Sequence, residues 1–158
     1  MSKKDNELNH LAIIMDGNGR WAQGRNQPVS SGHLEGANTL KRITQYVRSL
    51  GIPNLTVYAF SKENWNRPAK EVEFLITLLK QYLLQALKEV SKEQTRIKFL
   101  GNLNKLDKEA TNLIKELEEG TKDYHNFSLN ICLSYSGREE IVDATKRIAQ
   151  DVIDKKIS

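Results

Sequence analysis

The fold of this chain is constrained most by a short apolar run that ends abruptly in a polar turn. Residues 10–15 read His-Leu-Ala-Ile-Ile-Met, and residues 16–21 read Asp-Gly-Asn-Gly-Arg-Trp. A continuous apolar run of this length is typical of a buried strand in a parallel sheet. The turn that follows supplies a carboxylate at Asp16, a guanidinium at Arg20 and the backbone N–H groups of a glycine-rich segment. These groups suit a diphosphate bound together with a divalent cation.

The same residues allow two other interpretations of this segment. Asp, Gly and Asn are the commonest turn residues, so the segment can also be an ordinary strand-to-loop turn. The pattern Gly17-x-Gly19-x-x-Ala22 partly matches the dinucleotide-binding fingerprint. We reject that match because we expect no helix to open at Gly19, and because no acidic residue closes a second strand about twenty positions further on.

Composition limits the class of protein. A chain of 158 residues predicts one domain over residues 1–158, and 28% charged with 39% hydrophobic residues is typical of a soluble globular protein. The net charge of +4 is too small to favour nucleic acid binding, but it suits an anionic substrate. Cys132 is the only cysteine and is expected in the core. We find no signal-like or membrane-spanning apolar segment and expect a cytoplasmic location.

Apolar periodicity then predicts four strands, each followed by a helix. The strands are expected at 10–15, 55–60, 96–100 and 127–133. A polar loop at 23–31 contains Pro28, and an apolar stripe from Ala37 to Leu50 predicts the first helix, with His33 in its first turn. Three more helices are expected at 68–90, opened by Pro68, at 107–119 with Gly120 at C′, and at 141–154. This alternation predicts an α/β fold with a mostly parallel sheet flanked by helices.

Polar segments follow three of the predicted strands, at Asp16, at 61–68 and at 134–138. Ligands of parallel sheets bind outside the carboxyl ends of the strands, so we expect these segments to converge at one edge. The helix between Val72 and Val90 is too apolar for a single buried stripe. It is either sandwiched in the core or has one face that lines an apolar cavity or a dimer contact. No strand follows the last helix, so we expect a chain truncated after the fourth strand and its helix.

These motifs resemble the cis-prenyltransferases. The matching segments are 10–22, Gly32-His33 with Gly36, 58–68, and Tyr135 with Gly137-Arg138, in the order of that family. The resemblance implies a transferase that condenses isopentenyl diphosphate with an allylic diphosphate, such as farnesyl diphosphate. The product is a Z-polyprenyl diphosphate such as undecaprenyl diphosphate, the precursor of the lipid carrier for cell-wall synthesis. It also implies Mg²⁺, a homodimer, a product that partitions to the membrane, and no nucleic acid partner.

The resemblance also implies roles for individual residues. Asp16 is expected to bind Mg²⁺ and to be catalytic together with Asn64, which we expect to orient a water or a phosphate oxygen that takes the proton. The long apolar helix is expected to wall a tunnel for the growing chain, with Phe127 towards its floor. The substrate-binding residues implied are Gly17, Asn18, Gly19, Arg20, Trp21, His33, Ser61, Lys62, Glu63, Trp65 and Arg67.

The chain departs from the family pattern in three places. Val29 stands where the family usually has Arg, and Ser134 and Ser136 alter an Asn-Tyr-Gly-Gly-Arg pattern. The resemblance also leads us to expect that this chain lacks the family's later segment, which grips isopentenyl diphosphate and completes the Mg²⁺ site. The alternative to an active synthase is therefore a chain that only binds a diphosphate or pairs with a full-length subunit. A third alternative is a fragment that folds poorly.

Overall fold

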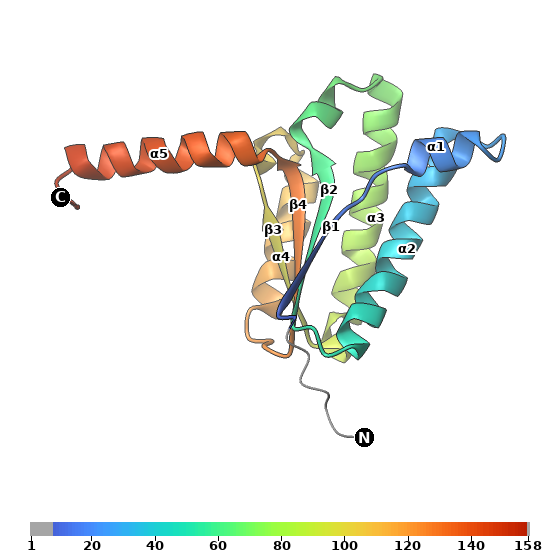
Figure 1. Ribbon diagram of the computed structural model, residues 1–158, viewed down its shortest axis with the longest axis horizontal. Helices are drawn as coiled ribbons and strands as arrows, with labels where there is room; N and C mark the ends of the chain where they lie inside the picture. Colours follow the sequence, from blue (N-terminus) through green and yellow to red (C-terminus); the bar gives the residue numbers. More distant parts are fainter. Residues whose placement is uncertain (1–7, 158) are drawn as a thin grey trace.

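A four-stranded parallel sheet forms the centre of the protein (Figure 1). The structure is a computed structural model that describes residues 8–157, without the side chains of residues 90–93. The expectations for residues 1–7 and for the side chain of Val90 lie outside that part. The strands are β1 (His10–Ile14), β2 (Asn54–Ser61), β3 (Thr95–Leu100) and β4 (Phe127–Tyr135), in the order β1-β2-β4-β3.

Helices alternate with these strands along the chain. They are α1 (Asn18–Gln23), α2 (Val29–Ser49), α3 (Ala69–Glu93), α4 (Lys108–Thr121) and α5 (Gly137–Ile153), with short 3₁₀ turns η1 (Lys62–Asn66) and η2 (Leu103–Lys105). The prediction of an α/β fold with a parallel sheet and flanking helices is confirmed. None of the helices described is long and apolar enough to cross a membrane.

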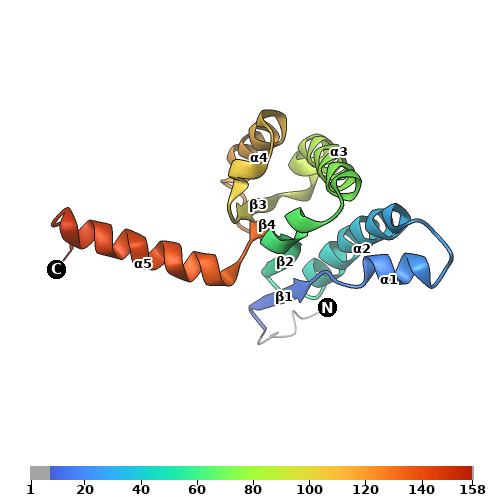
Figure 2. The ribbon, with the colours of Figure 1, turned by 90° about the horizontal axis from the view of Figure 1, so that it is seen from above.

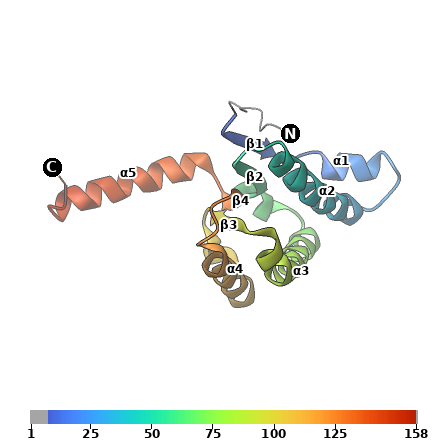
Figure 3. The same ribbon diagram turned by 90° about the horizontal axis from the view of Figure 1, so that it is seen from below.

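Helices α2, α3 and α4 lie together on one side of the sheet, as the views from above and below both show (Figures 2 and 3). The burial pattern of strand β3 reflects this one-sided packing. Thr95, Ile97 and Phe99 are buried, whereas the residues that alternate with them are more accessible. Two apolar clusters fill the space beneath the helices. The first contains Phe60, Leu83, Ile97, Phe99, Ile114, Leu117 and Leu133, and the second contains Val47, Ile52, Leu55, Val57, Phe127 and Leu129.

Helix α5 is the exception to this packing, because it projects away from the sheet (Figure 1). None of its residues is buried, and its apolar stripe is open, with Ile141 69% and Ile153 72% exposed. The predicted stripe is therefore present in the sequence, but in this structure it does not pack against a sheet face.

Helix α1 shows that one expectation about the turn after β1 was wrong. We expected no helix to open at Gly19, yet a six-residue helix spans that position, preceded by Gly17 with a φ of 90°. This helix is too short to be stable by its own hydrogen bonds, and it forms because it packs against α2. The absence of an acidic residue at the required distance is then the remaining sequence argument against a dinucleotide site.

Two helix boundaries also differ from the prediction. Helix α2 begins at Val29, directly after Pro28, so the loop before it is shorter than expected and His33 lies in the second turn rather than the first. Helix α4 continues past Gly120 to Thr121, so Gly120 is not at C′. The Thr121 hydroxyl accepts a 3.1 Å hydrogen bond from the Ile97 backbone and donates one to the Leu117 carbonyl, which holds this last turn against β3.

Candidate functional site

The turn after β1 places Asp16 and Arg20 side by side at the carboxyl edge of the sheet. The Oδ2 atom of Asp16 lies 3.0 Å from an Arg20 nitrogen, and both side chains are about three quarters exposed. The backbone N–H of Gly17 donates to the other carboxylate oxygen. This N–H, followed by Arg20 and then Arg67, lowers the pKa of Asp16 below its usual value. Asp16 is therefore ionised and accessible, as a ligand for a hard cation must be.

Two glycines of α2 let this turn approach the helix closely. A β-carbon at Gly32 would lie 2.0 Å from the Asn18 carbonyl oxygen, and one at Gly36 would lie 2.6 Å from the Asn18 amide nitrogen. Because residues four apart share one face of a helix, Gly32 and Gly36 together form the surface on which Asn18 rests. Position 29 also lies beside the turn, since the Cγ1 atom of Val29 would be 3.7 Å from a β-carbon at Gly19.

His33 and Arg67 are joined through a residue that sequence reasoning missed. The Nε2 atom of His33 lies 3.1 Å from Oε1 of Glu71, and the same oxygen accepts a 2.9 Å hydrogen bond from Arg67. His33 is 9% exposed, so this contact is largely shielded from water. The available sequence signal was the spacing of four between Arg67 and Glu71 at the start of a helix, which favours an ion pair.

The turn η1 is built by its own side chains. The backbone N–H of Ser61 donates to Oδ1 of Asn64 at 2.9 Å, and the Ser61 hydroxyl caps the turn in return. Hydrogen bonds from its own backbone N–H and from Ser61 lower the pKa of Glu63. Lys62 contacts Glu139 at the start of α5, and this contact raises the pKa of Lys62. The predicted site residues Ser61, Lys62, Glu63 and Asn64 therefore form one structural unit.

Two tryptophans flank this edge in different ways. The Trp65 indole N–H donates a 2.9 Å hydrogen bond to the Ser134 hydroxyl, and its ring meets the Phe60 ring edge-on at 5.1 Å. Trp21 lies on α1, where the Arg25 guanidinium stacks 4.2 Å from the ring centre. Trp65 thus holds η1 on the body of the protein, whereas Trp21 is 37% exposed.

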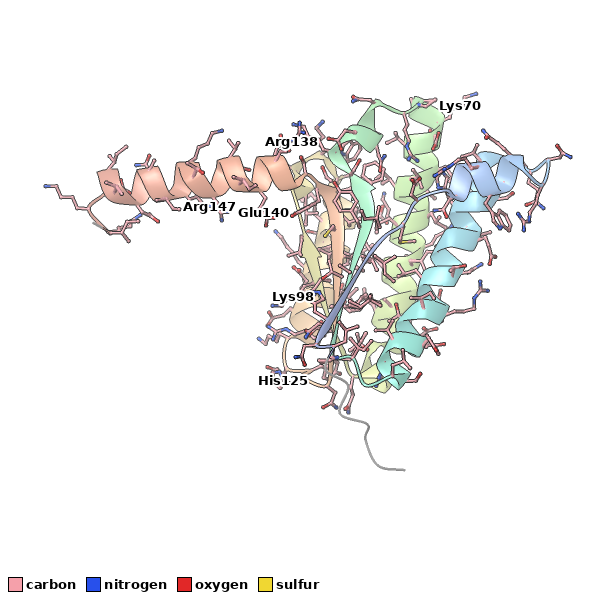
Figure 4. The ribbon with its side chains drawn as sticks, in the orientation of Figure 1. Lys70, Lys98, His125, Arg138, Glu140 and Arg147 are labelled. Atoms are coloured by element: carbon pink, nitrogen blue, oxygen red, sulfur yellow. The ribbon has the colours of Figure 1, made fainter. Side chains whose placement is uncertain are left out.

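The three polar segments converge at one sheet edge, as predicted from their positions after the carboxyl ends of parallel strands. Arg67 acts electrostatically on Asp16, Trp65 contacts Ser134 near the end of β4, and Lys62 contacts Glu139 at the start of α5. Arg138 and Glu140 lie at the first turn of α5 beside this edge, whereas Arg147 lies further out along the helix (Figure 4). The Tyr135 hydroxyl donates to Glu140, which raises the pKa of Tyr135 to about 12. Tyr58 in turn donates to the Tyr135 carbonyl at 2.8 Å.

An apolar cavity of about 310 Å³ runs beneath this edge, between α2, α3 and the sheet. Asn18, His33 and Trp65 line its end near the polar edge, and Gln45 and Glu89 line it towards the far ends of the two helices. Its walls between these ends are mainly apolar and include Leu40, Leu75, Leu79, Ala86, Phe99 and Ile131. Its volume falls within the range of roughly 300–1,000 Å³ that small-molecule sites occupy.

This cavity decides between the alternatives for the long apolar helix. One side of α3 packs against the core beneath α4 through residues such as Leu87, and another side lines the cavity. Phe127, which we expected towards the floor of a tunnel, is not among the cavity-lining residues. It is 1% exposed and packs with Val47 and Ile52 in the second apolar cluster.

A metal at this edge would depend on Asp16. Across residues 8–157, no group of three or more His, Cys, Asp and Glu side chains is arranged to hold a metal ion. Mg²⁺ does not need such a cage, because it commonly binds through one or two carboxylates together with waters and substrate phosphates. A single exposed, ionised carboxylate beside a glycine-rich turn fits that mode of binding.

Comparisons with known proteins agree with this arrangement. The family profile described as putative undecaprenyl diphosphate synthase matches residues 14–158. An isoprenyl transferase of Prochlorococcus marinus is 48% identical over 140 residues, which are 89% of this chain and 52% of the relative. One from Aquifex pyrophilus is 44% identical over 138 residues, 87% of this chain and 60% of the relative. The chain thus spans a little over half the length of these two relatives.

Two solved structures share the fold. The crystal structure of lavandulyl diphosphate synthase from Lavandula x intermedia, in complex with dimethylallyl diphosphate, has a TM-score of 0.90 at 33% identity, over 94% of this chain and 64% of that one. A probable undecaprenyl diphosphate synthase from Campylobacter jejuni has a TM-score of 0.76 at 35% identity, over 97% of this chain and 65% of that one.

Proposed function

The chain belongs to the undecaprenyl diphosphate synthase family of isoprenyl transferases, the cis-prenyltransferases, and we propose that it serves the Mg²⁺-dependent condensation of isopentenyl diphosphate with farnesyl diphosphate. The observation that carries this proposal is the apolar cavity that meets the polar edge at Asn18, His33 and Trp65. An anionic head at the edge and an isoprenoid tail in the cavity match these two environments. The product would be a Z-polyprenyl diphosphate such as undecaprenyl diphosphate, used in cell-wall synthesis.

The turn from Gly17 to Arg20 is proposed to hold the allylic diphosphate. Its backbone N–H groups and the Arg20 guanidinium face the oxygens that gain negative charge as the leaving group departs, and Arg67 adds a second guanidinium nearby. Asp16 is the residue on this chain that would hold Mg²⁺. When bound, that cation neutralises charge on the diphosphates.

The reaction breaks the allylic carbon–oxygen bond, and diphosphate leaves with the electron pair. The alkene of isopentenyl diphosphate attacks the allylic carbon, and a proton is then lost. Asn64 is placed on η1 with its amide oxygen already bound to Ser61 N–H, and a carboxamide is a weak base. We therefore propose that Asn64 orients a water or a phosphate oxygen that takes the proton.

A second candidate function is binding without turnover, in a chain that pairs with another subunit. The observation that favours a protein contact is the open apolar stripe of α5, with Ile141 and Ile148 more than half exposed. A homodimer and a cytoplasmic location are part of both proposed functions, whereas release of the product to the membrane is part of the first. Analytical ultracentrifugation of the wild-type chain and of an Ile141→Glu, Ile148→Glu variant tests the contact.

Product formation from farnesyl diphosphate and labelled isopentenyl diphosphate with Mg²⁺ tests the main proposal. A ladder of polyprenyl products from the 158-residue chain supports a synthase. Saturable binding of farnesyl diphosphate without product supports the second function instead. If neither binding nor product is found with a cooperatively folded chain, both functions are rejected for this chain.

A further inference from the structure

Strand β4 is irregular where it reaches the carboxyl edge. Its pairing with β2 runs from Phe60 opposite Leu133 to Ser61 opposite Tyr135, which leaves Ser134 without a partner residue in β2. Ser134 has a φ of 49°, in the left-handed region that a side chain rarely adopts. It is also 4% exposed. A bulge of this kind redirects a side chain, and such bulges are common beside functional sites.

The backbone around Ser134 is held from the side of β3. The Asn102 N–H donates a 3.3 Å hydrogen bond to the Ser134 carbonyl. Gly101, with a φ of 126°, lies so close that a β-carbon there would be 2.1 Å from the Leu133 carbonyl oxygen. The turn after β3 and the end of β4 therefore support one another, which explains how a serine is kept in an unfavourable conformation.

The Ser134 hydroxyl points from this bulge to η1, where it accepts the 2.9 Å hydrogen bond of the Trp65 indole. Trp65 is one residue from Asn64 and two from Arg67. The Arg67 N–H donates back to the Asn64 carbonyl at 3.2 Å, so these three residues move as one turn. A displacement of the Trp65 ring would shift both Asn64 and Arg67 relative to Asp16.

We propose that Ser134 is a positioning residue that holds η1, through the Trp65 indole, in the orientation that presents Lys62–Asn64 and Arg67 to the diphosphates. The effect of Ser134 on diphosphate binding rests on the proposed function. Its positioning of η1 through the Trp65 hydrogen bond does not depend on that function. The unfavourable backbone conformation is retained because it aims the hydroxyl at Trp65.

The experiment uses the ¹⁵N-labelled chain with Ser134→Ala, which removes the acceptor, and Ser134→Asn, which supplies an amide oxygen and favours the left-handed region. Trp65→Phe assigns the indole signal and removes the same hydrogen bond from the other side. Ser136→Ala is the matched control, because the Ser136 hydroxyl does not cap the adjacent helix. Farnesyl diphosphate affinity with Mg²⁺ is measured for each by titration calorimetry.

In Ser134→Ala we expect the Trp65 indole signal to shift and the amides of Lys62–Asn64 to exchange faster with solvent. The affinity for farnesyl diphosphate should fall about fivefold, as expected for the loss of one buried hydrogen bond. Ser134→Asn should restore both properties, and Ser136→Ala should change neither. Unchanged amide exchange in both Ser134→Ala and Trp65→Phe overturns the proposal whether or not the chain binds the ligand. Faster exchange with unchanged affinity overturns its substrate-positioning part.

Discussion

Glu71 on α3 lies 3.1 Å from His33 on α2, and His33 lines the polar end of the apolar cavity. The same carboxylate oxygen accepts a hydrogen bond from Arg67. One side chain therefore links two helices and fixes a guanidinium that we place at the diphosphate site.

Replacing Glu71 should weaken both the fold and the site. Because Glu71→Leu leaves the largely buried His33 without this partner, we expect the free energy of unfolding to fall by about 1–2 kcal/mol. Urea denaturation measures this change. Glu73→Leu is the control, because Glu73 is exposed two residues further along the same helix. Equal losses in the two variants would contradict the role of the His33 contact.

The two glycines beneath Asn18 should respond differently to an added methyl group. Gly32→Ala meets the Asn18 backbone, so it should destabilise the chain by about 1–3 kcal/mol, as overpacking does. Gly36→Ala meets only the Asn18 side chain, which can rotate, so it should lower diphosphate affinity more than stability.

Thermal unfolding and calorimetric titration with farnesyl diphosphate separate these two effects. Gly120→Ala is the control, because nothing lies within 4 Å of a β-carbon there and the residue is inside α4. It should stabilise the chain by roughly 0.5–1 kcal/mol. The reverse order of stability between Gly32→Ala and Gly36→Ala would contradict the predicted contacts.

The carboxyl group of Asp16 should titrate below the usual range for an aspartate. The Gly17 N–H is the largest cause of the lowered pKa and Arg20 is the next, so Arg20→Ala should raise the pKa only part of the way. Because the folded-state pKa is depressed, ionised Asp16 favours the folded chain above its usual pKa of about 3.9. That contribution is lost as the pH falls through the lowered value.

Carbon-detected NMR titration of the Asp16 carboxyl group measures this pKa directly. Arg25→Ala is the matched control, because the Arg25 guanidinium stacks on Trp21 instead. A full return to the usual value in Arg20→Ala would show that the Gly17 N–H has no effect.

Restoring a cation at position 29 should strengthen diphosphate binding. Val29 begins α2 beside Gly19, so an arginine there can reach the turn that we propose holds the diphosphate. Val29→Arg should raise the affinity for farnesyl diphosphate by about tenfold through one charge-assisted hydrogen bond. Val29→Gln, of similar length without charge, is the control in the same titration. Equal affinities in the two variants would contradict a diphosphate at this turn.

Filling the cavity should lower the affinity for a ligand with an isoprenoid tail more than the affinity for a ligand without one. Ala86 lines the apolar wall on α3, so Ala86→Phe should lower the affinity for farnesyl diphosphate by at least tenfold but change that for inorganic diphosphate by less than about twofold. Ala149→Phe on the exposed face of α5 is the control. Equal loss for both ligands would indicate a general distortion rather than a tail-binding cavity.

Much of this arrangement could be predicted from the sequence. The apolar runs and stripes predicted the four strands, the longer helices and their alternation, because these patterns depend on local periodicity. The convergence of Asp16, the 61–68 segment and the 134–138 segment followed from a general property of parallel sheets. Strand and helix ends were correct to within a few residues where a proline or an N-cap marked them, as Pro68 does for α3.

Other features depend on contacts between distant segments. Helix α1 has too few residues to be predicted alone, and it forms because Gly32 and Gly36 accept Asn18. The last turn of α4 is held against β3 by the hydrogen bond that the Thr121 hydroxyl accepts from the Ile97 N–H. A local pattern around Gly120 does not reveal this contact. The contact of His33 with Glu71 spans 38 residues and carries no local signal.

The sequence by itself thus determined which residues form strands and helices, and which sheet edge carries the polar chemistry, because side-chain periodicity and strand direction are properties of the chain. Only the tertiary structure decided how deep the apolar cavity runs, that α5 stands apart from the sheet, and that Ser134 adopts a left-handed conformation to hold Trp65. Those outcomes depend on whether surfaces from separate segments fit together, and no single segment contains that information.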